Sequence, residues 1–366
     1  LASIIGLFFL YRYLECNPIR IGGGGPSNPL PARCYAKEQE QQRKTQMAQL
    51  EQLTALEFTC QKEELPPLSE ETQQLYNYAL YHDLHNMWTG DKGDEVWNGL
   101  ARYYRIAAAN GDYKANIRLQ YLLETGRVVP EKPQTELYHL NKELEKQLSA
   151  TAMYKLYYHL GGNFGVSTEK GGKFAFLRKA ADMGSRDAQF ELGEQIERID
   201  DKATLAFRKQ LVEQLLSCAA KQGQGDAAKS LGIGLKIDKK YQQAVETFHL
   251  GVKNGNRQSA FRLYRAFSTE PRDKLTYLGV TPDPERSLRY KLIEKFLFDN
   301  EYLHATVPDL DDIVPLPPAK LPAWDGKIAF QRWYEGPSPA KPSDELMQKL
   351  AAQAGLDWQT GLPLKK

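Results

Sequence analysis

The chain has 366 residues, enough for two compact domains or one extended array, and 42% of them are hydrophobic and 26% charged. These fractions are close to those of globular proteins and argue against both a largely disordered chain and a polytopic membrane protein. Lysine and arginine (48) exceed aspartate and glutamate (46) by only two, with no long block of either sign, so no electrostatic footprint for nucleic acid is present.

The first predicted element is an apolar run at residues 1–14, followed by glycines at 22–25 and prolines at 18, 26, 29 and 31. The run is shorter than the ~20 residues that span a bilayer, so it fits a signal peptide, part of a signal anchor or an apolar first helix. We expect a signal anchor or signal peptide remnant over residues 1–15, favouring an uncleaved anchor, and a flexible linker over residues 16–33. Cys16 lacks the small preceding residues of a lipobox. The protein is therefore expected in the periplasm, held in the inner membrane by its N-terminus.

Residues 34–95 are expected to form an N-terminal helical cap. Residues 36–56 place Met47, Leu50 and Leu53 at helical spacing, which predicts a helix with one apolar stripe. The sequence Leu-Pro-Pro-Leu at residues 65–68 ends this helix, and Ser69 is a suitable N-cap for a second one.

An oxidising compartment would permit one disulfide among Cys34, Cys60 and Cys218. A straight helix between Cys34 and Cys60 would separate their Cα atoms by more than the ~7 Å that a disulfide allows. Cys218 is followed by two alanines and also fits a small core position. The pairing is therefore left open.

Four segments of the chain share one register. Each contains a glycine that ends a helix, a small residue four positions later and a leucine eight positions later. In chain order the positions are Gly111, Ala115 and Leu119; Gly184, Ala188 and Leu192; Gly223, Ala227 and Leu231; and Gly255, Ser259 and Leu263. A degenerate unit lies between the first two, where Leu148 replaces the glycine ahead of Ala152 and Leu156.

These offsets predict a helix–turn–helix hairpin. Positions four apart share one helix face, so the small residue admits a neighbouring helix and the leucine fills the gap one turn later. The glycine supplies left-handed backbone at the turn, and Ser185 or Asp226 can cap the following helix. A single hairpin buries its apolar face only by stacking on others, so the sequence predicts an all-α protein, with an α-solenoid over residues 96–300 that has a concave surface.

One unit carries a fuller motif. Its residues are Gly161, Gly165, Val166 and Lys170, followed by Phe176, Lys179, Ala180, Ala181 and Gly184. This pattern resembles a Sel-one-like repeat, a relative of the tetratricopeptide repeat. Other units depart from it, since the first lacks the Gly-Val turn and the last has Gly251-Val252 in place of Lys-Ala-Ala. The resemblance implies the same solenoid.

The C-terminal extension, residues 301–366, is rich in proline, which predicts an extended strap, and Ser343 and Gly355 bracket a final short helix. The flanks and repeats together resemble a narrower bacterial group. The matching stretches are residues 100–119, 283–296, 313–318, 324–326 and 341–364. Members of this group resemble immunity proteins encoded beside type VI secretion effectors, especially phospholipase D-like lipase toxins.

No sequence motif indicates catalysis, a cofactor or a metal. His82, Asp83 and His85 lie close together, but neither a third ligand at suitable spacing nor an HExxH or CxxC motif accompanies them. The aspartates at 309, 311 and 312 lack the spacing and glycine of an EF-hand loop and fit a solvated turn. Phosphate-loop and nucleophile motifs are also missing. The sequence therefore predicts a protein that is not an enzyme and has no cofactor.

Tyrosine is frequent in the repeats, and it is common both in protein interfaces and in solenoid packing. We expect Tyr104, Tyr121 and Tyr157 to pack in the core. Tyr154 and Tyr158, with Arg118 and Arg262 at equivalent helix positions, are the candidates for contacting a partner on the concave face.

The resemblance to this bacterial group implies an immunity protein that binds a phospholipase-type toxin in the periplasm and occludes its active site. The alternative is an envelope scaffold or signalling adaptor that binds a self protein through the same surface. A neighbouring gene for a secreted lipase would favour the first function. Activity lost on mutating His82 or His85 would instead favour an enzyme.

Overall fold

The structure, a computed structural model, describes residues 57–87, 91, 93–162, 164–202, 204–268 and 274–364, and also the helical residues 36, 39–41 and 43–44. Within these ranges the regular elements are α-helices and one 3-10 helix, with no strand. The elements are α3 Glu70–Asn86, α4 Glu95–Ala109, α5 Tyr113–Glu124, α6 Pro133–Glu145, α7 Ser149–Gly161, α8 Lys173–Asp182, α9 Arg186–Glu197, α10 Leu205–Lys221, α11 Gly225–Ile237, α12 Tyr241–Lys253, α13 Arg257–Phe267, α14 Pro284–Asp299, η1 Glu301–Leu303, α15 Leu310–Ile313, α16 Ala329–Glu335 and α17 Asp344–Gln353. The predicted all-α fold is confirmed.

The hairpins α4–α5, α8–α9, α10–α11 and α12–α13 share one turn geometry. Their glycines have left-handed φ angles, +92° at Gly111, +107° at Gly184, +98° at Gly223 and +83° at Gly255. Glycine adopts this conformation without the steric cost that a side chain brings. The small residues four positions later are all 0% exposed, and they are Ala115, Ala188, Ala227 and Ser259. The leucines at 119, 192 and 263 are buried one turn further on, whereas Leu231 is only partly buried.

Side chains at these turns begin the second helix of each hairpin. Asp112, Ser185 and Asn256 each accept a hydrogen bond from the backbone N–H three residues later. Helix α11 differs, because the expected cap Asp226 already lies inside the helix. Its cap is Gln224, whose side chain accepts from the N–H groups of Asp226 and Ala227.

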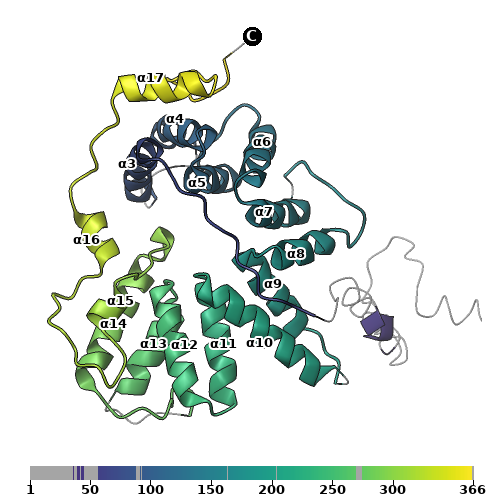
Figure 1. The fold of residues 1–366 in the computed structure, drawn as a ribbon, viewed down its shortest axis with the longest axis vertical. Helices are drawn as coiled ribbons and strands as arrows, with labels where there is room; N and C mark the ends of the chain where they lie inside the picture. Colours follow the sequence, from purple (N-terminus) through teal and green to yellow (C-terminus); the bar gives the residue numbers. More distant parts are fainter. Residues whose placement is uncertain are drawn as a thin grey trace, which may run out of the picture.

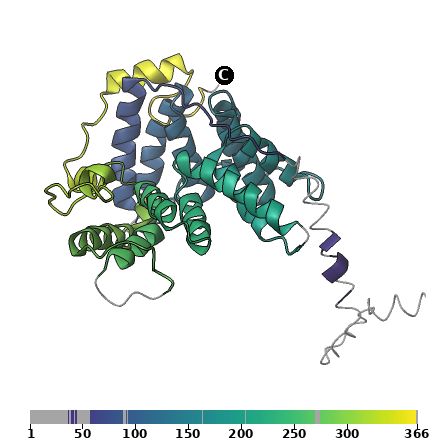
Figure 2. The ribbon, with the colours of Figure 1, turned by 60° about the horizontal axis from the view of Figure 1, so that its bottom comes forward.

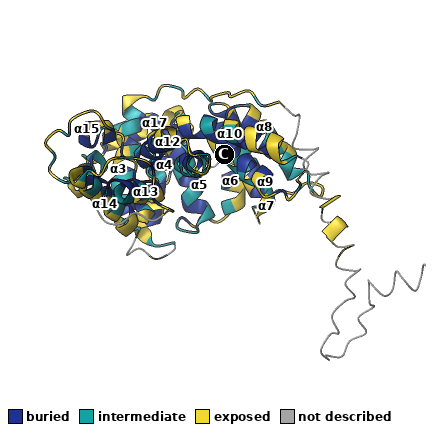
Figure 3. Ribbon diagram, turned by 90° about the horizontal axis from the view of Figure 1, so that it is seen from below, coloured by how far each residue is buried: buried dark blue, intermediate teal, exposed yellow. Residues whose placement is uncertain are grey.

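Consecutive helices from α3 to α14 pack against one another and form an arc (Figure 1). The buried residues gather where the helices face each other, and the exposed residues lie on the outer surfaces (Figure 3). Large core clusters follow one another along the arc, and Leu231 packs against two of them. The core is therefore shared between neighbouring repeats, as expected for a solenoid.

Residues 57–69 form an extended segment, here called the N-terminal strap, which crosses the turns of the central repeats. The backbone carbonyl of Gln61 accepts hydrogen bonds from the side chains of Gln189 at 3.0 Å and Gln222 at 3.3 Å. The carboxylate of Glu63 accepts from the N–H groups of Ala150, at 2.7 Å, and Thr151, and so satisfies the free donors at the start of α7. The strap therefore ties successive repeats together from outside.

A disulfide fixes the strap to the solenoid. It joins Cys60 to Cys218 of α10, with the two Cα atoms 5.6 Å apart. The structure thus identifies the pair of cysteines that the sequence left open. Helix α3 begins after Ser69, whose side chain accepts from the N–H of Thr72 as predicted. Most of the predicted helix at residues 36–56 lies outside the described residues.

The C-terminal extension crosses the open side of the arc and returns to its beginning (Figures 1 and 2). The Tyr81 hydroxyl of α3 donates to the carbonyl of Gly336 at 2.8 Å, just after α16. Helix α17 then packs on α4, where Leu350 is buried in the same core cluster as Tyr104. Ser343 caps α17, and Gly355 follows its end with φ +67°, as predicted. The extension thus joins the two ends of the solenoid.

No helix in the described ranges is both long and apolar enough to cross a bilayer. The apolar residues 1–14 and the following linker lie outside those ranges. The signal anchor therefore stays a prediction.

Candidate partner-binding surface

Arg118, one of the residues predicted to contact a partner, is held in a buried ion pair between α5 and α3. Its Nε donates to Asp83 at 2.8 Å, a second nitrogen bonds the other carboxylate oxygen, and the Tyr104 hydroxyl donates to the same carboxylate at 2.5 Å. Asp83 is 0% exposed. Burial opposes the charge of Arg118, but its hydrogen bond to Asp83 and the charge of that carboxylate outweigh this and raise the pKa of Arg118. Arg118 therefore joins two helices, and little of it is accessible to a partner.

Arg262 stands at the equivalent position of the last repeat, seven residues after its glycine, in a different environment. Its guanidinium lies 5.6 Å from the centre of the Phe248 ring and makes no ion pair with a described carboxylate. Because it is half-buried without such a partner, the pKa of Arg262 is lowered by desolvation. Of the two predicted arginines, Arg262 is therefore the one whose charge is free to pair with a carboxylate of another protein.

Tyr154 and Tyr158 lie on α7 and differ in exposure. The Tyr154 ring stacks on that of Tyr157 at 5.9 Å, and burial raises the pKa of Tyr154. Tyr158 is 49% exposed and lies beside the ring of Phe164. The four predicted partner-contacting residues are spread over α5, α7 and α13, and no hydrogen bond or ring contact joins any two of them where the structure describes the chain.

The histidine and aspartate clusters hold the C-terminal extension in place. His85 stacks on Tyr334 of α16 at 4.2 Å, and His82 lies 3.0 Å from the Ser338 hydroxyl. Asp311 pairs with His249 at 2.8 Å and also with the ammonium group of Lys253 on α12. No three His, Cys, Asp or Glu side chains among the described residues are grouped as a metal site.

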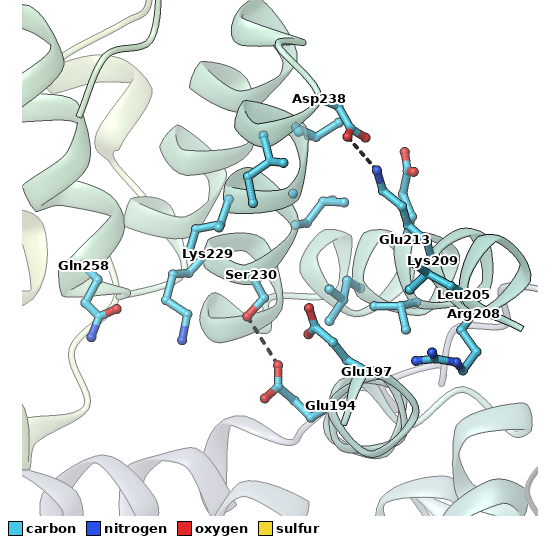
Figure 4. Close-up of a pocket in the computed structure, with 17 residues that line it drawn as sticks. Glu194, Glu197, Leu205, Arg208, Lys209, Glu213, Lys229, Ser230, Asp238 and Gln258 are labelled. Atoms are coloured by element: carbon cyan, nitrogen blue, oxygen red, sulfur yellow. Dashed lines mark hydrogen bonds and ion pairs between the residues drawn. The ribbon is translucent and has the colours of Figure 1, made fainter. Parts of the chain in front are cut away.

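A hollow with a volume of about 550 Å³ lies between α9, α10 and α11 (Figure 4). We call it the α9–α11 groove. Its apolar lining includes Val212 and Leu216 of α10 and Ile233 of α11. At its mouth lie two aliphatic side chains that are largely open to solvent, Leu205, 57% exposed, and Ile237, 71% exposed. A concave apolar surface with exposed aliphatic residues is typical of a binding site.

Charged groups surround this groove, with carboxylates on α9 and α10. Glu194 and Glu197 come from α9 and Glu213 from α10. Lys209 forms an ion pair with Asp238 at 2.6 Å, and Arg208 donates to the carbonyls of Ile196 and Asp201. These two cations are therefore occupied within the chain.

Sequence reasoning missed this groove. Its lining comes from three helices and mixes repeat positions with positions outside the shared register. One local signal was present, Gly234 in the interior of α11, because a glycine there weakens a helix unless it has another role.

Residues 259–364 match the model of a domain of unknown function, DUF6396. The DUF6396 region begins inside α13 and so joins part of the last repeat to the C-terminal extension as far as residue 364. No curated protein matches this chain.

Several solved structures are similar to the chain. Immunity protein Pa5087 from Pseudomonas aeruginosa is 26% identical, with 72% of this chain and 95% of that chain covered and a TM-score of 0.51. The P. aeruginosa protein PA5086 is 27% identical, with 71% and 95% covered and a TM-score of 0.52. Immunity protein PA5088 from the same organism has the same fold at 23% identity, with 71% and 94% covered and a TM-score of 0.52. The resemblance to immunity proteins that the sequence predicted is confirmed.

Proposed function

We propose that this protein is an immunity protein, which protects a cell by binding a toxin. The observation that carries the proposal is the similarity of this chain to immunity protein Pa5087, which extends over 95% of the length of that protein. The action is stoichiometric, because a protein that only binds inactivates one toxin molecule per copy.

The architecture suits tight binding. The solenoid ends are joined by the C-terminal extension, and the strap is fixed by the Cys60–Cys218 disulfide. A surface that is already ordered loses little conformational entropy on association, which favours affinity. A stable complex needs roughly 800 Å² from each partner, and a solenoid surface provides such an area.

In finer detail, the toxin we propose is a phospholipase D-like lipase effector of a type VI secretion system, and the protein blocks its active site in the periplasm. This part is supported by the sequence resemblance of the flanks, by the apolar N-terminal run and by a disulfide of the kind that persists in oxidising compartments. Anchoring through the N-terminus would keep the protein at the membrane whose lipids the toxin attacks.

The test is a rescue experiment in a bacterial host that exports a candidate phospholipase D-like effector to its periplasm. Co-expression of the full-length protein should restore growth, and the purified pair should form a stable one-to-one complex. A catalytically dead effector is the control for toxicity. If the correctly exported protein prevented lysis by none of the lipase effectors encoded nearby, this function would be contradicted. The envelope adaptor would then be favoured.

A further inference from the structure

The α9–α11 groove contains a glycine that the packing of the chain does not require. A Cβ atom at Gly232 would lie 2.7 Å from the Phe248 ring, so that position must be small. A Cβ atom at Gly234 would meet nothing within 4 Å, although Gly234 lies in the interior of α11 and lines the groove. A residue such as alanine would stabilise the helix. The missing side chain leaves room in the groove for atoms from elsewhere.

The charged side chains around the groove indicate the charge of the group that binds there. Lys229, the remaining cation of the lining, is 3.4 Å from Asp226. Glu197 is exposed, and it has no ion-pair or hydrogen-bond partner in the described part of the chain. The carboxylate of Glu213 makes only a long contact, 3.8 Å, with the ammonium group of the exposed Lys240. Arg208 bonds only neutral oxygens, so the lining holds four carboxylates, those of Glu194, Glu197, Glu213 and Asp238, against three cations. Its net charge is therefore negative, and a positively charged partner is complementary to it.

We propose that the α9–α11 groove binds an amphipathic segment of the toxin, in which apolar side chains are flanked by a lysine or arginine. The apolar side chains lie against Ile233 and Ile237 and over the backbone at Gly234. The cationic group lies beside Glu197. This inference rests on the proposed immunity function and adds to it the site on this protein and the chemistry of the segment it receives.

The test measures the affinity of the full chain for a purified, catalytically inactive form of the candidate effector used in the rescue experiment. In Gly234→Trp the indole fills the groove, and we expect the Kd to rise about 100-fold, as for loss of a central contact. Glu197→Lys reverses the rim charge, and we expect about a tenfold rise that shrinks as salt is added. The matched control is Gly99→Trp on α4, where a Cβ atom also meets nothing within 4 Å and the residue is exposed. It should bind within about twofold of wild type, since the change lies outside the contact.

Circular dichroism and thermal unfolding show whether each variant is folded, and replacing a helical glycine is expected to preserve the fold. Unchanged affinity in both groove variants, beside a wild-type protein that binds, would overturn the groove while leaving the immunity function intact. A wild-type protein that binds no effector would overturn both. A wild-type dimer that Gly234→Trp dissociates would assign the groove to a second copy of this chain and overturn the proposal.

Discussion

The first repeat, α4–α5, and the third, α8–α9 when the degenerate unit is counted as the second, share one register. They differ in the segments from outside the repeats that pack over them. In the first, α4–α5, a Cβ atom at the turn glycine Gly111 would meet nothing within 4 Å, and the hairpin is covered by α3 and α17. In the third, α8–α9, the N-terminal strap passes directly over Gly184, where a Cβ atom would lie 2.6 Å from the backbone nitrogen of Glu63. The repeats thus fix the packing between helices, and segments outside the repeats decide which surfaces are closed.

The same contrast extends to side chains. Arg118 of the first repeat is paired with Asp83, which α3 contributes from outside the repeats, while the equivalent Arg262 has no described carboxylate partner. At the α9–α11 groove, by contrast, the lining that the structure describes comes from the repeats alone, and this face of the solenoid is open to a partner.

The largest expected effect tests the cover of the first repeat. Asp83→Ala leaves the Arg118 guanidinium buried without its counter-ion, and we expect the free energy of unfolding to fall by about 3–5 kcal/mol. Urea denaturation of the purified protein measures it. The matched control is Asp299→Ala, which removes the exposed Lys295–Asp299 pair and should leave the free energy of unfolding nearly unchanged. Similar losses in the two variants would contradict a structural role for the Asp83–Arg118 pair.

The next effect tests the strap over the central repeats. Cys60→Ala removes the disulfide to Cys218 and should lower the free energy of unfolding by about 2–4 kcal/mol, because the unfolded chain gains freedom. Adding a reductant to the wild-type protein should produce a similar loss, measured by urea denaturation. The variant itself should respond little to reductant. A wild-type protein whose stability does not change on reduction would show that this cross-link contributes nothing.

Much of this arrangement could be predicted from the sequence, because it depends on local patterns. The glycine, alanine and leucine offsets predicted the hairpins, and Ser69, Ser343 and Gly355 predicted helix ends from their own side chains or lack of one. The contacts between distant segments could not be predicted in this way. Asp83 opposite Arg118, Cys60 beside Cys218 and Glu63 at the start of α7 are brought together only by the path of the strap and helix α3. The groove was missed for the same reason.

The smallest expected effect is a difference in stability between alanine substitutions at the turn glycines of the first and third repeats. Gly111→Ala and Gly184→Ala both place a Cβ atom on left-handed backbone, which costs about 1–2 kcal/mol. Gly184→Ala must in addition displace the strap, since its neighbours at 2.6 Å and 2.8 Å are backbone atoms of Glu63 and Lys62 that cannot rotate away as a side chain would. We therefore expect it to cost about 1 kcal/mol more than Gly111→Ala in urea denaturation.

The excess should depend on the strap being held against the turn. Combined with Cys60→Ala, which lets residues 57–63 move more freely, Gly184→Ala should cost nearly as little as Gly111→Ala, whose own cost should not change. Equal losses for the two glycines in the disulfide-bonded protein would mean that the strap does not press on the third repeat. The difference between the covers of the two repeats would then reside in α3 and α17 alone.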